Sequence, residues 1–143
     1  MDKIKVLFLC TGNSARSQMA EAFLRSRAGD RFEVYSAGLH PQGIHPLTRA
    51  VMREKGLDLE DQSSKSLTEY LGRVHFSYLI TVCDRAREEC PAVFPGVNHH
   101  IHMPFDDPAA AEGSPEEKME IFREVRDRIE VWIQDWIEEV SPR

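Results

Sequence analysis

Residues 4–17 read Ile4-Lys-Val-Leu-Phe-Leu-Cys10-Thr-Gly-Asn-Ser-Ala-Arg16-Ser17, and this stretch decides the fold of the 143-residue chain. Its first six residues form an apolar run of strand length, which is typical of a β-strand covered on both faces. Residues 10–16 form a polar loop, and residues 17–25 have the pattern of a helix with a broad buried face. A strand, a short loop and a helix in this order predict the first unit of an α/β domain.

The rest of the chain continues the alternation of strands and helices. Strand-like segments lie at 32–37, 76–83 and 99–103, and helix-like segments lie at 46–56, 67–71 and 84–89. A long final helix ends near Val140 and has apolar residues at three- and four-residue spacing. The sequence therefore predicts an α/β fold with a single domain over residues 1–143, a four-stranded parallel sheet and helices on both faces.

The ends of the predicted strands carry the reactive side chains. The first strand ends at Cys10, the third ends at Cys83, and the fourth leads to Asp107. Ligands of parallel α/β sheets bind beyond the carboxyl ends of the strands. We therefore expect these three side chains to converge on one edge of the sheet.

The loop after the first strand is suited to bind a tetrahedral oxyanion. Its backbone N–H groups can surround the anion, with the Cys10 sulfur beneath the central atom and the Arg16 guanidinium on the oxygens. The loop amides, the positive end of the following helix and Arg16 all favour the thiolate of Cys10, which is the nucleophilic form. The predicted oxyanion site consists of Thr11, Gly12, Asn13, Ser14, Ala15, Arg16 and Ser17.

Composition and charge exclude several classes of partner. The net charge is -6 and no stripe of Lys or Arg is present, so nucleic acid and anionic membranes are poor candidates. No apolar stretch approaches ~20 residues, and the first residues do not resemble a signal peptide, so we expect a cytoplasmic monomer. The His99-His100-x-His102 segment matches no standard zinc site. We therefore expect no metal and no cofactor.

The loop resembles the phosphate-binding loop of the low-molecular-weight protein tyrosine phosphatase superfamily. The resemblance continues through Met19-Ala20-Glu21, Ser36-Ala37-Gly38 and Asp107-Pro108. It implies that Asp107, rather than the adjacent Asp106, is the general acid that protonates the departing oxygen. A phosphatase acting on phosphotyrosine or on a small phosphate ester is therefore one functional hypothesis.

A second resemblance favours different chemistry on the same scaffold. Val82-Cys83, Cys90-Pro91 and the segment 105–109 are similar to the corresponding parts of thioredoxin-coupled arsenate reductases. This resemblance implies that Cys10 attacks arsenate, that Cys83 attacks Cys10 and expels arsenite, and that Cys90 then forms a disulfide with Cys83 for thioredoxin to reduce. Ala109 and the next two alanines replace the aromatic residues that usually follow this Asp-Pro in tyrosine phosphatases, which favours a small inorganic substrate.

The spacing of the last two cysteines adds a geometric requirement. If 83–90 were a regular helix, the two Cα atoms would lie about 10 Å apart, whereas a disulfide requires less than ~7 Å. A Cys83–Cys90 disulfide therefore requires this segment to bend or unwind.

The principal alternatives remain a phosphatase in which these two thiols are redox guards, and a non-catalytic oxyanion-responsive regulator, for which we find no DNA-reading element.

Some arsenate reductases of this type bind potassium near the loop, through the positions of Asn13, Glu21 and a Ser/Thr-x-Asp segment. Here the comparable stretch is Ser63-Ser64-Lys65. We expect the Lys65 ammonium to supply the positive charge in place of a potassium ion.

Overall fold

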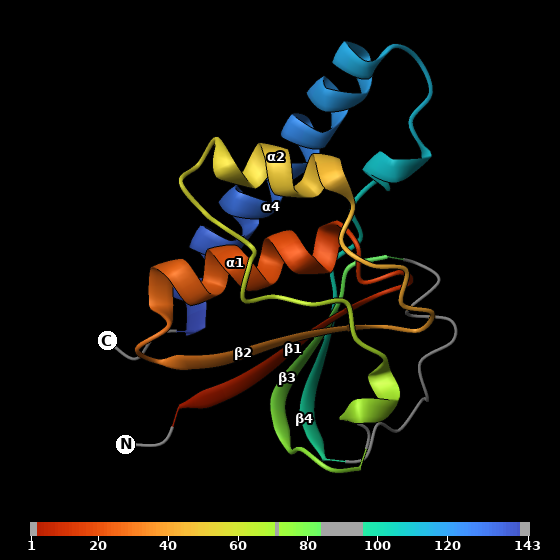
Figure 1. Ribbon diagram of the computed structural model, residues 1–143. Coiled ribbons are helices and arrows are strands. Elements are labelled where there is room, and N and C mark those ends of the chain that lie inside the picture. Colours follow the sequence, from red (N-terminus) through yellow and green to blue (C-terminus); the bar gives the residue numbers. More distant parts are fainter. Residues whose placement is uncertain (1–2, 71, 84–95, 141–143) are drawn as a thin grey trace.

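The computed structural model describes residues 3–70, 72–83 and 96–140 (Figure 1). Four parallel strands form one sheet, as the alternating sequence pattern predicts, and their order in the sheet is β2-β1-β3-β4. The strands are β1 (Ile4–Cys10), β2 (Phe32–Gly38), β3 (Phe76–Thr81) and β4 (Val97–His102). No helix within these described ranges combines the length and the apolar character needed to cross a membrane.

The strand register brings the carboxyl ends of the strands to one edge. Cys10 is paired with Gly38 of β2, and Thr81 of β3 is paired with His102 of β4. β3 was predicted to continue to residue 83, but it ends at Thr81, where its pairing with β1 and β4 also ends. The predicted helix at 84–89 lies outside the described residues.

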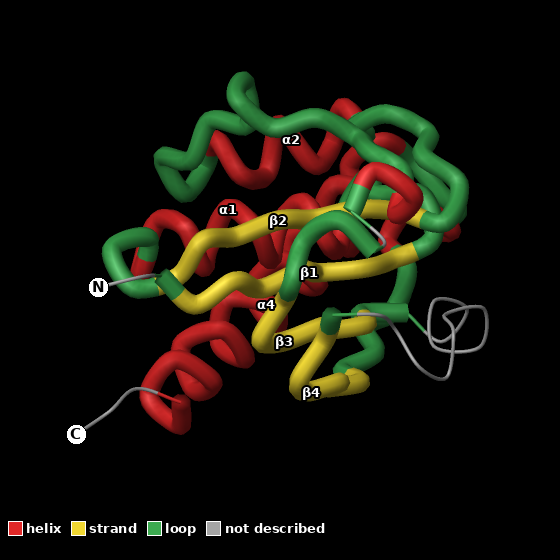
Figure 2. The backbone as a smooth tube through the Cα atoms, turned by 90° about the horizontal axis from the view of Figure 1, so that it is seen from below, coloured by secondary structure: helices red, strands yellow, loops and turns green. Residues whose placement is uncertain are grey.

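Helices cover the two faces of the sheet unequally. Figures 1 and 2 show α1 (Arg16–Ala28), α2 (Pro46–Arg53) and α4 (Pro115–Val140) on one side and the short 3-10 helix η1 (Leu67–Glu69) on the other. Trp136 of α4 contacts Phe32 and Tyr78, with ring centroids 5.4 and 5.1 Å apart. Its helix-on-sheet packing agrees with the periodicity of the final helix.

The central strand is the most deeply buried element. Residues 6–9 of β1 are completely buried, in agreement with their uninterrupted apolar character. The completely buried side chains of Leu79 and Ile80 extend this core into β3. A rigid strand therefore leads directly to Cys10.

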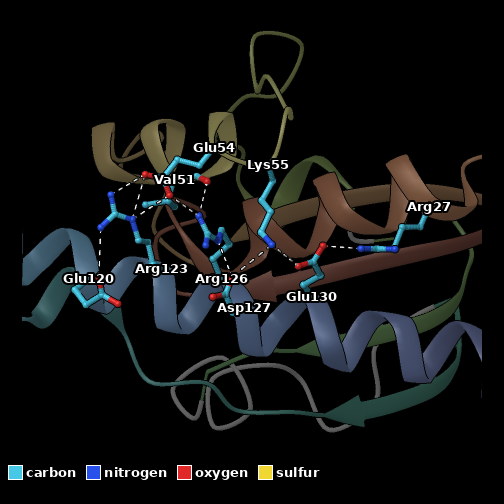
Figure 3. A network of polar contacts seen from close by, with 9 residues as sticks. All are labelled: Arg27, Val51, Glu54, Lys55, Glu120, Arg123, Arg126, Asp127 and Glu130. Carbon is cyan, nitrogen blue, oxygen red and sulfur yellow. Dashed lines mark hydrogen bonds and ion pairs between the residues drawn. The ribbon is translucent and has the colours of Figure 1, made fainter.

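Charged side chains join the three α-helices on their common side (Figure 3). Glu54, just after α2, accepts hydrogen bonds from Arg123 and Arg126 of α4, and these bonds lower its pKa to about 2. Farther along α4, Glu130 pairs with Lys55 and also with Arg27 of α1. This network fixes α2 and α4 relative to α1, whose first residue is Arg16.

Candidate active site

The loop between β1 and α1 encloses one side of a cavity of about 240 Å³. The carbonyl oxygens of Thr11, Gly12 and Ser14 are already paired, because they accept hydrogen bonds from backbone N–H groups within residues 40–45 at 2.8–3.0 Å. A trans peptide directs its N–H opposite to its carbonyl, so this pairing leaves the N–H groups that follow these carbonyls available to an anion on the other side of the loop. The described residues that line the cavity are Cys10, Thr11, Gly12, Ser14, Ala15, Arg16, Gln42, Asp107 and Ala109.

Asn13 holds the loop in its tight curve. It has a positive φ of 48°, a left-handed conformation that Asn tolerates better than most residues. Its side-chain oxygen accepts a hydrogen bond from the Lys65 N–H at 2.8 Å, and its side-chain nitrogen donates to Ser17 Oγ at 2.8 Å. A Cβ on Gly38 would lie 2.8 Å from the Asn13 nitrogen, so only glycine lets β2 approach the loop this closely.

Cys10 lies where the sequence pattern predicts a nucleophile. Its side chain is buried, and its sulfur lies 3.0 Å from Ser17 Oγ at the first turn of α1. The amino-terminal end of α1 is directed at the same cavity, and its dipole favours negative charge there. The position of Cys10 beneath the cavity and its contact with Ser17 place the sulfur where it can attack the central atom of an anion bound in the loop.

Arg16 and Asp107 face one another across the mouth of the cavity. The buried Arg16 guanidinium donates to the Phe105 carbonyl at 3.0 Å and lies 3.7 Å from the Asp107 carboxylate. Asp107 caps the 3-10 helix η2 (Pro108–Ala110) by accepting a hydrogen bond from the Ala109 N–H at 3.0 Å. The side chain of Asp106 is 88% exposed and pairs with Arg128. Of the two adjacent carboxylates, Asp107 is therefore the one that lines the cavity.

Cys83 lies against the residue that follows Cys10. Its buried sulfur is 3.3 Å from Thr11 Oγ1. Backbone hydrogen bonds from Val82 to Leu9, and from Phe105 to Val82, hold this segment at the carboxyl edge of the sheet. Cys10 and Cys83 are both present as thiols. The third predicted cysteine, Cys90, lies outside the described residues.

The positive charge near Glu21 comes from a residue that sequence reasoning missed. The Lys65 ammonium donates to the Ser63 carbonyl, whereas the Arg25 guanidinium forms the ion pair with the Glu21 carboxylate. The Lys65 ammonium binds within the segment compared with the potassium site, so its role as the replacing charge stays a prediction, and Arg25 is an additional cation at Glu21. The i,i+4 spacing of Glu21 and Arg25 in the predicted helix is the signal that could have indicated this pair.

Two glutamines also support the loop without a clear signal in the sequence. Gln18 donates to the carbonyls of Asn13 and Ser63, at 3.0 and 2.9 Å, and Gln62 donates to the Gln18 side-chain oxygen at 2.8 Å.

Among the residues that the structure describes, no group of three or more His, Cys, Asp or Glu side chains is arranged to hold a metal ion.

The comparisons with known proteins assign the chain to a family. Residues 5–143 match the model of the low molecular weight phosphotyrosine protein phosphatase family. The chain belongs to this family. An arsenate reductase of Halalkalibacterium halodurans is 43% identical to this chain over 129 residues. The aligned part covers 90% of this chain and 91% of the arsenate reductase.

Solved structures agree with the family assignment. An arsenate reductase in its reduced state is 27% identical, with a TM-score of 0.75 over 96% of this chain and 99% of the other. A thioredoxin-dependent arsenate reductase of Corynebacterium glutamicum is 34% identical, with a TM-score of 0.65 over 92% of this chain and 62% of the other. Both of these solved structures are of proteins named arsenate reductases.

Proposed function

We propose that this protein reduces arsenate to arsenite, with Cys10, Cys83 and Cys90 as successive thiols and thioredoxin as the final reductant. The observation that carries the proposal is the contact of the Cys83 sulfur with Thr11, at 3.3 Å and next to Cys10. Phosphate ester hydrolysis through a cysteine requires only one sulfur, whereas reduction requires a second thiol near the first. The 43% identical arsenate reductase supports the same interpretation.

The first step is a displacement at arsenic. The Cys10 thiolate forms a sulfur–arsenic bond with hydrogen arsenate, the bond from arsenic to its hydroxyl oxygen breaks, and the departing hydroxyl takes a proton from Asp107 and leaves as water. The loop N–H groups and Arg16 stabilise the charge on the remaining oxygens. Arsenic remains in its +5 state, and no electrons have yet been exchanged with the protein.

Reduction occurs when the second sulfur attacks the first. The Cys83 thiolate attacks the Cys10 sulfur, and the sulfur–arsenic bond breaks with its electron pair passing to arsenic. Arsenite with arsenic in the +3 state leaves, and the two sulfurs form a disulfide. Cys90 then attacks Cys83 and releases the Cys10 thiolate. Two thiol exchanges with thioredoxin reduce the Cys83–Cys90 disulfide and oxidise thioredoxin.

The shape of the cavity supports a small inorganic substrate. Its volume is about 240 Å³, and its described lining includes Ala109 and Gln42 but no aromatic side chain. A phosphotyrosine ring would therefore find no aromatic surface on this lining to stack on. A relay that begins with reduced thiols and ends on thioredoxin suits a reducing compartment. We propose that the protein is cytoplasmic and acts as a monomer.

The same oxyanion-binding loop would support a second activity. Phosphate and arsenate have the same tetrahedral shape and charge, so the loop and Cys10 would also support weak hydrolysis of small phosphate esters. Membership in the phosphatase family favours this residual activity. It needs Cys10, Arg16 and Asp107 but neither of the other two cysteines.

The two activities separate in one experiment. Arsenate-dependent NADPH oxidation is measured with thioredoxin and thioredoxin reductase, beside hydrolysis of p-nitrophenyl phosphate, for the unmodified protein and for Cys83→Ser and Cys90→Ser. We expect both variants to lose arsenate turnover and to keep the ester hydrolysis of the unmodified protein. Cys90→Ser should stop after one event, with a Cys10–Cys83 disulfide detectable by mass spectrometry. Full arsenate turnover by Cys83→Ser would refute the relay.

A further inference from the structure

A continuous series of hydrogen bonds leads from the Cys10 sulfur to a cation on α1. Its interior members are almost entirely buried: Asn13, Ser17 and Ser36 have no exposed surface, and Glu21 is 4% exposed. The contacts run from Cys10 Sγ to Ser17 Oγ at 3.0 Å, to Asn13 Nδ2 at 2.8 Å, to Ser36 Oγ at 3.0 Å, then to the Glu21 carboxylate and the Arg25 guanidinium.

The direction of every proton in this series is fixed by one backbone group. The Lys65 N–H can only donate, so the side-chain atom of Asn13 that faces it at 2.8 Å must be the oxygen. The Asn13 side-chain nitrogen therefore faces Ser17 and Ser36, and it donates one proton to each hydroxyl. Each hydroxyl accepts from Asn13 and has its own proton left to donate.

These protons go in opposite directions. The Ser17 hydroxyl donates to the Cys10 sulfur, where it stabilises the thiolate. The Ser36 hydroxyl donates to the Glu21 carboxylate. The Asn13 amide therefore joins the hydrogen bond on the Cys10 sulfur to the hydrogen bond on Glu21, and both depend on the position of the Asn13 side chain.

Glu21 can remain that acceptor only if its buried charge is compensated. A buried carboxylate without a partner is costly and takes up a proton or moves. Arg25 supplies the partner, and its guanidinium is held in place by the Val34 carbonyl at 2.8 Å and by the Gln62 side-chain oxygen at 3.3 Å. Gln62 in turn donates to the Gln18 side chain, and Gln18 donates to the Asn13 carbonyl, so the same guanidinium also supports the backbone of the loop.

We infer that Arg25 is a positioning residue for Cys10: by compensating the buried Glu21 carboxylate and anchoring Gln62, it keeps Asn13, and with it the Ser17 hydroxyl, in place beside the Cys10 sulfur. The inference rests on the proposed function in that it takes Cys10 as the nucleophile. Arg25 is not one of the residues that line the cavity, and it acts on Cys10 through Glu21 and through Gln62. Its loss should therefore change the reactivity of Cys10 without removing any part of the oxyanion site.

The test is the pH profile of Cys10 alkylation by iodoacetamide in the full chain, followed by peptide mass spectrometry. Arg25→Gln should move the profile to higher pH and slow alkylation at neutral pH about tenfold, since a hydrogen bond to an anionic sulfur is weakened. Arg25→Lys, which keeps the charge, should restore most of the rate. The matched control is Arg27→Gln, because Arg27 also lies on α1 and pairs with a glutamate, Glu130, but on the side away from the loop.

A double variant separates positioning from loss of structure. In Arg25→Gln with Glu21→Gln no uncompensated carboxylate remains, and the amide oxygen introduced at position 21 can still accept from Ser36, so the alkylation profile should return toward that of the unmodified protein. An Arg25→Gln profile equal to the original, an equal shift in Arg27→Gln, or no recovery in the double variant would overturn the inference. Alkylation requires neither arsenate nor thioredoxin, so it remains interpretable even if the reductase proposal fails.

Discussion

Asp107→Asn tests the proposed proton donor, and the adjacent Asp106 provides a matched control. Both residues are aspartates of the same loop, but only Asp107 lines the cavity and lies 3.7 Å from the Arg16 guanidinium. Asp106 is directed outward and pairs with Arg128. The same substitution at the two positions therefore changes the charge of the loop equally and differs only in what the lost carboxyl group faces.

The expected magnitude follows from what Asn retains. Its side-chain oxygen can still accept the Ala109 N–H, so η2 keeps its cap. The side chain of Asp107 is 45% exposed, so its ion pair with Arg16 is worth less than ~1 kcal/mol, and the arsenate KM should change by no more than about fivefold. The lost proton transfer should lower the rate of the chemical step by about 10²–10⁴-fold.

The assay is a single turnover of the fully reduced protein with excess arsenate, in which the formation of the enzyme disulfide is followed by mass spectrometry. Measuring this one event removes the later exchange with thioredoxin from the observed rate. Asp106→Asn should stay within about twofold of the original rate, as surface substitutions usually do. Equal losses in the two variants, or a loss in Asp107→Asn that appears only in KM, would refute the role of Asp107 as general acid.

The α2–α4 contact and the loop offer three more tests. Arg126→Met should lower the free energy of unfolding by about 2–3 kcal/mol, because its buried guanidinium donates to Glu54 and to a backbone carbonyl of α2. The more exposed Arg123→Met should lower it clearly less, and urea unfolding that gives equal losses would contradict the difference in burial. Hydrogen bonds from Arg123 and Arg126 lower the pKa of Glu54 from 4.5 to about 2, so its carboxylate stabilises the fold above pH 4.5, and this contribution is lost as the pH falls toward 2. Glu54→Gln should flatten the acid dependence of unfolding in that window, and parallel curves would count against the shift. Ser17→Ala removes the donor 3.0 Å from the Cys10 sulfur and should slow alkylation of Cys10 at neutral pH about 10–100-fold, a prediction that an unchanged rate would disprove.

The arrangement of the strands could be predicted because it depends on patterns that are local in the sequence. The apolar run before Cys10 identifies a central strand, and the alternation of strands and helices requires parallel pairing. Parallel pairing in turn brings the ends of β1 and β3 to the same edge, so the proximity of Cys10 and Cys83 needed no knowledge of side-chain packing. The roles of these residues remain predictions, and Cys90 lies outside the described residues.

The polar support of the loop could not be predicted in the same way. Lys65 lies next to the loop in the relevant segment, yet its ammonium binds the Ser63 carbonyl, while Arg25 reaches Glu21 from one turn farther along α1. Long flexible side chains choose partners according to packing, and a sequence pattern restricts that choice only to a set of neighbours. The fixed spacing within α1 was the better guide because a helix determines which side chains share a face.

The structure of the oxyanion-binding loop limits how such a protein could distinguish arsenate from phosphate. Backbone bonds from residues 39–45 and side chains of Asn13 and Gln18 hold the loop from outside the cavity, so its N–H groups are arranged before any anion arrives. Both anions are tetrahedral and carry similar charge, so this prearranged loop should bind them with similar affinity. If Cys10 attacks the anion as proposed, the choice between arsenate and phosphate would be made after this attack, because thiols can reduce arsenic in the +5 state whereas phosphorus in that state resists them. The second sulfur, rather than the anion site, would then determine the substrate, and phosphate would bind in competition with arsenate without being reduced.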